Sequence, residues 1–241
     1  MVCTGNKTSF IVKNLAPSEV YTFRIRSETL PNWVLFKRST LEGPFFTTRH
    51  LLSAMRSKKF SVIRKIIKER PDLLEIENKK ANTPLVQAIR ENDMKMSNLL
   101  LHLGANINNH LMFSKKTPLM IAVNHGYFDL TKFLVNKGAS IQDVDINGLG
   151  LLHNAVDTGN FEMVEYFVGL GLDVNARDKH GLTPLLRAVI LEVDNRIVEF
   201  LLQNGADESI CDRNGFNATE HKGIIDGKLK YNVPPPKFIF L

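Results

Sequence analysis

The sequence contains few of the residues that build chemical sites or membrane spans. Cys3 and Cys211 are the only cysteines in 241 residues, too few for a disulfide framework or a zinc site. There is no run of 18 apolar residues, so no membrane-spanning helix is predicted. The first residues show no basic segment followed by an apolar one, so no secretory signal is expected. We therefore expect a protein of the cytoplasm or nucleus.

The composition, 44% hydrophobic and 23% charged, is ordinary for a folded protein. The net charge of +6 is unevenly placed, because residues 1–80 hold 16 Lys or Arg against 7 Asp or Glu. Such a basic segment could attract nucleic acid or an acidic protein. The interpretation that we favour is a lysine-rich helix face exposed to solvent.

The dominant pattern is a passage that recurs every 33 or 34 residues and reads Thr-Pro-Leu in three of four copies. The copies start at Thr83, Thr117, Gly150 and Thr183. A period near 33 predicts a solenoid, in which no unit buries its apolar face alone. A solenoid of this kind mostly offers a surface to a partner, so binding is favoured over catalysis.

Residues 115–142 predict the structure of one unit. Thr117 is suited to cap a helix and Pro118 to occupy its first position. A turn at 124–127 precedes a second helix, which Gly138 ends by supplying a left-handed residue. The unit is therefore helix, turn, helix and hairpin-like loop. An alanine recurs where we expect paired helices to approach closely: Ala88, Ala122, Ala155 and Ala188.

These motifs resemble the ankyrin repeat, as in Thr183-Pro184-Leu185 with Asn204-Gly205-Ala206-Asp207. The resemblance implies a mainly α solenoid of five to six helix-turn-helix units. We place these units within residues 49–230, at about 49–80, 81–114, 115–147, 148–180 and 181–211, with a degenerate unit at 212–230. Residues 231–241 form a tail, which either caps the last unit, as we favour, or serves as a docking peptide.

Two places depart from the regular repeat. The fifth unit carries one extra residue around Glu192–Asp194, and the loop Asn109–Lys116 is one residue longer and lacks its glycine. The fourth unit alone keeps the histidine of the motif, His153. The resemblance implies that this imidazole ties neighbouring turns together by hydrogen bonds.

Residues 1–48 show a different pattern. Tyr21, Phe23 and Ile25 alternate with polar residues, which predicts a half-buried strand. Leu15-x-Pro17-x-Glu19-x-Tyr21 resembles the last strands of a fibronectin type III domain, with Tyr21 at the tyrosine-corner position. Phe45–Thr48 resembles the closing strand. Such a sandwich needs about seven strands, so we expect only a truncated part of one.

With both segments, the sequence is similar to proteins that join fibronectin type III and ankyrin repeat domains. That family implies an adaptor of the cytoplasm and nucleus, with a cilium as a further location, linked to control of transcription or cell survival. The alternatives from the residues are a nuclear factor that contacts nucleic acid through the basic first unit and a ciliary or cytoskeletal scaffold.

No grouping of residues predicts catalysis, a metal site or a cofactor. The seven histidines are scattered and are never paired at the spacing of metal ligands. The Ser, Cys and carboxylate residues show no pattern of a nucleophile with its base. We expect a monomer that is not an enzyme and binds a protein partner in the concave surface of the stack, rather than nucleic acid or a membrane. Asp145 and Asp178 are expected to stabilise turns. The predicted partner-binding residues are Lys79, Lys80, Gln87, Arg90, Glu91, Lys115, Lys116, Asn124, Ile146, Asn154, Asp157, Lys179, His180 and Arg187.

Overall fold

The computed structural model describes residues 20–25, 34–39, 46–78 and 81–227, and it divides the chain into two compact units, 1–47 and 48–241. In the first unit, strand β1 (Val20–Ile25) pairs with strand β2 (Val34–Ser39). The pairing is antiparallel, with Tyr21 opposite Arg38 and Phe23 opposite Phe36. The alternation at Tyr21–Ile25 therefore predicted a real strand.

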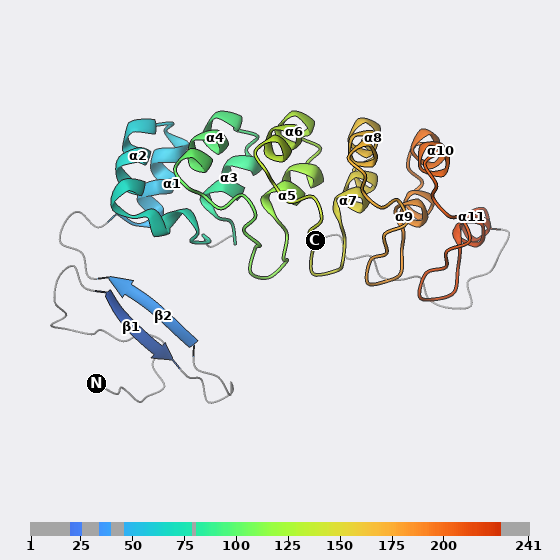
Figure 1. Ribbon diagram of the computed structural model, residues 1–241, viewed down its shortest axis with the longest axis horizontal. Coiled ribbons are helices and arrows are strands. Elements are labelled where there is room, and N and C mark those ends of the chain that lie inside the picture. Colours follow the sequence, from blue (N-terminus) through green and yellow to red (C-terminus); the bar gives the residue numbers. More distant parts are fainter. Residues whose placement is uncertain (1–19, 26–33, 40–45, 79–80, 228–241) are drawn as a thin grey trace. The chain divides into compact units, whose positions relative to one another are not determined.

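The second unit is a stack of helices. The helices are α1 (Thr48–Arg56), α2 (Phe60–Glu69), the short 3-10 helix η1 (Pro71–Leu74), α3 (Pro84–Arg90), α4 (Met94–His102), α5 (Pro118–Asn124), α6 (Phe128–Asn136), α7 (Leu151–Asp157), α8 (Phe161–Gly169), α9 (Pro184–Ile190), α10 (Asn195–Gln203) and α11 (Ala218–Ile225). Within this unit, α1, α3, α5, α7, α9 and α11 form one row, the remaining α-helices form a second, and long loops project from one side (Figure 1). The solenoid prediction is confirmed.

The repeated threonine begins three of the first-row helices. The hydroxyl oxygens of Thr83, Thr117 and Thr183 accept hydrogen bonds from the backbone N–H three residues later, at 3.2–3.3 Å. Proline follows each threonine at a position where its missing N–H leaves no bond unmade. The local prediction for the start of each helix is therefore confirmed.

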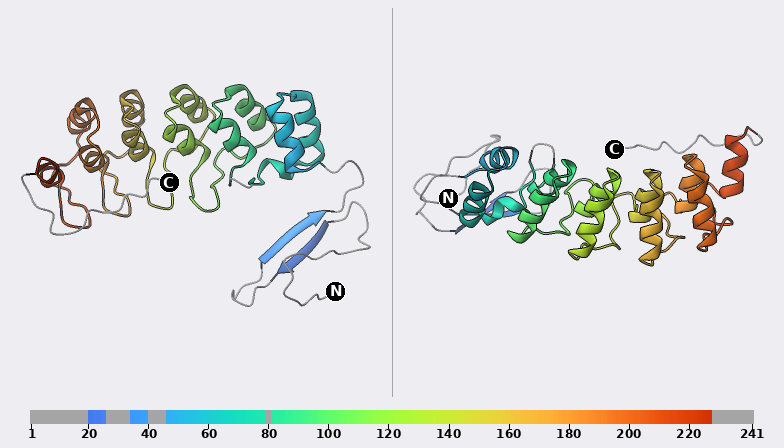
Figure 2. Two further views of the ribbon diagram at one scale, coloured as in Figure 1. Left: turned by 180° about the vertical axis from the view of Figure 1, so that it is seen from behind. Right: turned by 90° about the horizontal axis from the view of Figure 1, so that it is seen from above.

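The repeated alanines lie at the contacts within the stack. Ala88, Ala122, Ala155 and Ala188 are at most 1% exposed. The first-row helices from α3 to α11 pack directly on one another, and α1, α3, α5, α7 and α9 each pack on the second-row helix that follows them. Seen from above, the pairs lie side by side like rungs (Figure 2). A larger side chain at these positions would push the helices apart, as the sequence predicted.

The two irregular places also occur as predicted. Four residues separate α9 from α10, but three separate α7 from α8. Between α4 and α5 there are 15 residues, against 14 between α6 and α7. In that longer loop Lys115 adopts a φ of 58°, the left-handed conformation that glycine adopts in the later loops. The lysine is therefore held in a conformation that costs about 1 kcal/mol.

The expectation for residues 45–48 is wrong. Phe46 and Thr47 lie in no strand, and Thr48 begins helix α1. The strand that pairs with β1 is instead β2, whose apolar run Val34-Leu35-Phe36 favours an extended conformation. A two-stranded pairing does not show a fibronectin type III domain. The predicted strand near Leu15 and the C-terminal tail lie outside the described residues.

Candidate partner-binding surface

Each long loop ends in a tight turn, which we call a tip loop. The tip loops comprise residues 111–116, 145–149, 178–182 and 212–216. In the last three, an aspartate (Asp145, Asp178 or Asp212) starts the turn, and its Oδ1 accepts hydrogen bonds from two backbone N–H groups of the turn at 2.8–3.0 Å. All three aspartates are buried. The prediction that Asp145 and Asp178 stabilise turns is therefore confirmed.

Backbone hydrogen bonds join each tip loop to the next. Ile146 N–H donates to Ser114 O, Lys179 N–H to Asn147 O and Arg213 N–H to His180 O, each at 2.9 Å. These three bonds form a continuous ladder, which we call the tip ladder. The side chains on the ladder therefore lie in a fixed order along the stack.

The first tip loop differs from the other three. Leu111 takes the place of the aspartate, since its N–H bonds Lys116 O while Lys115 N–H bonds back to Leu111 O. Leu111 is buried, whereas Met112 and Phe113 are 67% and 74% exposed. The longer loop thus carries two large apolar side chains that face solvent.

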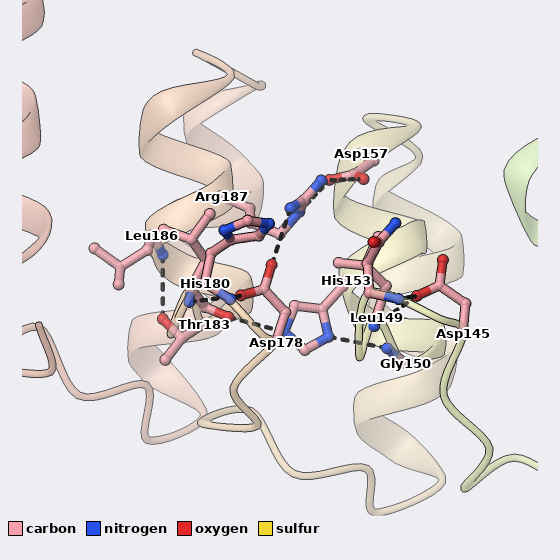
Figure 3. A network of polar contacts seen from close by, with 12 residues as sticks. Asp145, Leu149, Gly150, His153, Asp157, Asp178, His180, Thr183, Leu186 and Arg187 are labelled. Atoms are coloured by element: carbon pink, nitrogen blue, oxygen red, sulfur yellow. Dashed lines mark hydrogen bonds and ion pairs between the residues drawn. The ribbon is translucent and has the colours of Figure 1, made fainter. Parts of the chain in front are cut away.

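Arg187 corrects one prediction, because it is not on an open surface. It lies on α9 with its side chain 7% exposed, and its guanidinium binds both oxygens of Asp157 at 2.6 and 2.7 Å. A third contact joins Arg187 Nη1 to Asp178 Oδ2 at 3.3 Å. Figure 3 shows how this group links α7 to α9. Arg187 holds two units together, so it is removed from the candidate surface.

The same position recurs in other units, nine residues after the turn aspartate. In the last unit, His221 Nε2 lies 3.2 Å from Asp212 Oδ2. In the fourth unit the position is Asn154, which is only 2% exposed, so its predicted exposure is also wrong. Neither Asn154 Nδ2 nor Asp145 Oδ2 has a hydrogen-bond partner among the described residues. Asp145 and Asn154 therefore occupy the same pair of positions without the bond.

We expect Asn154→His to raise the free energy of unfolding by about 1 kcal/mol. The new imidazole would meet the buried Asp145 Oδ2, as His221 meets Asp212 in the last unit. Urea denaturation followed by circular dichroism measures the change. Asn154→Leu is the control, because leucine is similar to histidine in volume but cannot donate a hydrogen bond. A gain of equal size in both variants would show that packing alone is responsible.

His153 joins the fourth and fifth units as the sequence predicted. Its Nδ1 accepts from Gly150 N–H at 3.3 Å, and its Nε2 lies 3.1 Å from Leu182 O, which assigns the proton to Nε2 (Figure 3). The first contact satisfies the N–H of Gly150 itself, while Gly150 has no side chain that could cap the N–H three residues later. Burial lowers the pKa of His153 below its ordinary value, and the nearby Arg187 cation adds to this effect.

This lowered pKa makes stability depend on pH. Well above the ordinary histidine pKa of about 6.5, the imidazole is neutral in both states. As the pH falls below that value, the unfolded chain takes up a proton before the folded chain does, so the free energy of unfolding decreases. We expect His153→Gln to weaken this decrease between pH 7 and 5.5, measured by urea denaturation at each pH. Parallel curves for the two proteins would exclude His153 as the cause.

The other predicted residues occupy several environments. Arg90, Glu91, Lys115, Ile146, Lys179 and His180 are exposed, and Gln87, Lys116, Asn124 and Asp157 are half-buried. Arg90 Nε donates to Asn82, and Glu91 accepts from Gln87. The tip ladder brings Lys115, Ile146, Lys179 and His180 into one row. Lys79 and Lys80 lie outside the described residues.

Three exposed apolar residues escaped the prediction: Met112, Phe113 and Val144, the last 51% exposed. The signal that identifies the first two is a pair of large apolar residues inside an over-long loop that lacks the turn aspartate. Among the described residues there is no group of three or more His, Cys, Asp or Glu side chains that could hold a metal ion. No helix in the described part of the chain is long and apolar enough to cross a membrane.

Comparison with known proteins agrees with the repeat. A family model described as ankyrin repeats (3 copies) matches residues 50–145 and 140–214. The ankyrin repeat protein FPV031 of fowlpox virus is 32% identical over 145 residues, 59% of this chain and 41% of that protein. SH3 and multiple ankyrin repeat domains protein 1 of Mus musculus is 33% identical over 118 residues, 48% of this chain and 5% of that protein.

A third relative is named as an enzyme. Phosphocholine transferase AnkX of Legionella pneumophila is 29% identical over 134 residues, 54% of this chain and 14% of AnkX. The chain thus spans less than half the length of each of these three relatives. The shared part is the repeat, and the activity in that name belongs to the relative as a whole.

Proposed function

Because the chain belongs to the ankyrin repeat family, we propose that it is a non-enzymatic adaptor that binds a protein partner along the tip ladder and the adjoining first-row helices. Ankyrin repeats suggest a role in protein–protein interaction. The observation that supports this surface is that the repeated and the unrepeated residues differ in burial. The repeated residues are buried in the frame, while Lys115, Ile146, Lys179 and His180 are exposed and held in one row.

The resemblance to proteins that combine fibronectin type III and ankyrin repeat domains adds a finer proposal. In that family context the adaptor would act in control of transcription or cell survival. This part of the proposal rests on the resemblance of residues 1–48, since the family model matches only the repeats.

Site-specific photo-crosslinking tests the proposed surface. A photo-reactive residue at His180 on the tip ladder is compared with one at Glu199, an exposed position on α10 in the second row. In cells we expect protein adducts from position 180 and few from position 199. Equal labelling from both positions, or none from position 180, would remove the tip ladder as the binding surface.

Nucleic-acid binding through the first unit is the second candidate. Helix α2 exposes Arg64, Lys65 and Lys68, while Ile63, Ile66 and Ile67 are buried. A basic row of this kind can contact phosphates. Its affinity for a labelled oligonucleotide should then fall steeply as salt is added, and Lys65→Glu should weaken it. No binding at low salt would exclude this candidate.

A further inference from the structure

The most exposed large apolar side chains lie on two neighbouring tip loops and on the residue just before the second of them. Met112, Phe113, Val144 and Ile146 are 49–74% exposed, more than any other large apolar side chain in the described part of the chain. Ile146 N–H donates to Ser114 O at 2.9 Å, which fixes the two loops side by side. Single exposed apolar residues are common, but a contiguous group marks an interaction site. We call these four residues the apolar tip.

The fold does not need these side chains in order to hold the loops. The first tip loop is held by buried Leu111, by its own backbone bonds, and by Met112 N–H donating to Glu77 Oε1 at 2.8 Å. The second is held by Asp145. Met112, Phe113 and Ile146 contribute only their backbone to this support. Their side chains are therefore available to a partner.

The exposed charged side chains of the tip loops have one sign, and the two carboxylates that adjoin the apolar tip, Glu77 and Asp143, are half-buried. Lys115, Lys179 and Arg213 are exposed along the tip ladder, and the aspartates of the same loops are buried and occupied by turn N–H groups. Asp178 and Asp212 are in addition paired with Arg187 and His221. The exposed charged side chains of the four tip loops are therefore all basic. A partner with carboxylates is complementary to this row.

We propose that the apolar tip and the basic residues beside it dock an acidic peptide segment of a partner protein. This inference rests on the proposed adaptor function. Large aliphatic or aromatic side chains of the segment pack on Met112, Phe113 and Ile146, and its carboxylates lie beside Lys179 and Arg213. A second copy of the chain fits less well, because two identical basic ladders repel each other. A nucleic acid would match the cations but leave most of the apolar tip uncovered.

Selection from a random-peptide library displayed on phage, with the full chain as bait, tests this proposal. We expect the enriched peptides to combine acidic residues with large apolar ones. An enriched peptide, synthesised with a fluorescent label, is then titrated by fluorescence anisotropy. Replacing Met112 and Phe113 together by serine should weaken binding by about tenfold or more. Replacing Lys179 and Arg213 together by glutamate should have a similar effect and reduce the salt dependence.

Two control variants match these changes away from the tip loops. Leu170→Ser removes an apolar side chain of 39% exposure after α8, and Lys95→Glu reverses an exposed charge on α4. Both should keep the affinity for the peptide. Thermal melting followed by circular dichroism should show that all four variants remain folded, since every replaced side chain is exposed.

The remaining outcomes contradict the proposal in different ways. Enriched peptides without acidic residues, or peptides whose binding is unchanged in the Met112 and Phe113 double variant, overturn this inference and leave the adaptor function standing. Failure to enrich any peptide overturns the inference, while crosslinking at His180 separately decides the adaptor function. An oligonucleotide that competes the peptide away and binds more tightly assigns the tip ladder to nucleic acid instead.

Discussion

Replacing Arg187 by methionine should lower the free energy of unfolding by about 3 to 5 kcal/mol. Methionine fills much of the same space but leaves the carboxylates of Asp157 and Asp178 without their cation. The Asp178 side chain is only 1% exposed, so water cannot replace the lost contact. Urea denaturation of both proteins at pH 7 measures the difference.

Arg196→Met is the matched control for this change. Arg196 also forms an ion pair with an aspartate, Asp194, at 2.7 Å, but its side chain is 72% exposed. An exposed pair contributes about 0 to 1 kcal/mol, so a small effect is expected. If both variants lose stability equally, burial of the Arg187 group is not what makes it important. Adding Asp178→Asn to Arg187→Met should recover part of the loss, because it removes one of the unpaired buried charges.

Gly181→Ala should be the second most damaging change, with an expected cost of about 2 to 3 kcal/mol. Gly181 has a φ of +79°, which strains any residue with a Cβ atom. An added Cβ would also lie 3.0 Å from Arg213 N, the group that donates to His180 O in the tip ladder. The variant therefore combines strain with damage to one bond of the ladder.

Gly205→Ala separates these two contributions. Gly205 has a similar φ of +89°, but an added Cβ would meet no atom within 4 Å. Its expected cost, about 1 to 2 kcal/mol, reflects strain alone. The difference between the two alanine variants in urea denaturation then measures the contact between neighbouring tip loops. Equal costs would mean that the third and fourth tip loops are not coupled through Gly181.

Much of the stack follows from local rules that the sequence displays directly. A threonine followed by proline specifies where Pro84, Pro118 and Pro184 begin helices, because the cap and the first turn involve residues within three positions. The period then repeats this local result. The longer first tip loop was visible for the same reason, as one surplus residue in an otherwise constant count.

The environment of Arg187 could not be predicted from such local rules. When its own unit is considered alone, its helix position is one where the side chain is expected to be exposed. Its burial depends on Asp157, which lies 30 residues earlier in the neighbouring unit. The spacing of nine residues from Asp178 to Arg187 and from Asp212 to His221 carries the signal, and it becomes meaningful only once the stacking is known.

The predicted surface included exposed charged residues of the tip loops but omitted their most exposed apolar residues. Charged side chains were selected because their exposure is easy to infer, so Lys115 and Lys179 are exposed as expected. Met112 and Phe113 were missed because apolar residues are ordinarily assigned to a core. In this loop the buried side chain is that of Leu111, and the two apolar residues after it are exposed.

The tip ladder also affects how the stack loses its order. Its bonds and the Arg187 ion pair connect residues 30 to 33 positions apart, so each contact between neighbouring units is held separately from the others. In such an array, opening can start at one of these contacts and spread from neighbour to neighbour. A peptide lying across Met112, Ile146 and Lys179 would span two of these contacts at once. Binding would then stabilise these neighbouring units jointly, and the units that contact the partner would open together rather than one by one.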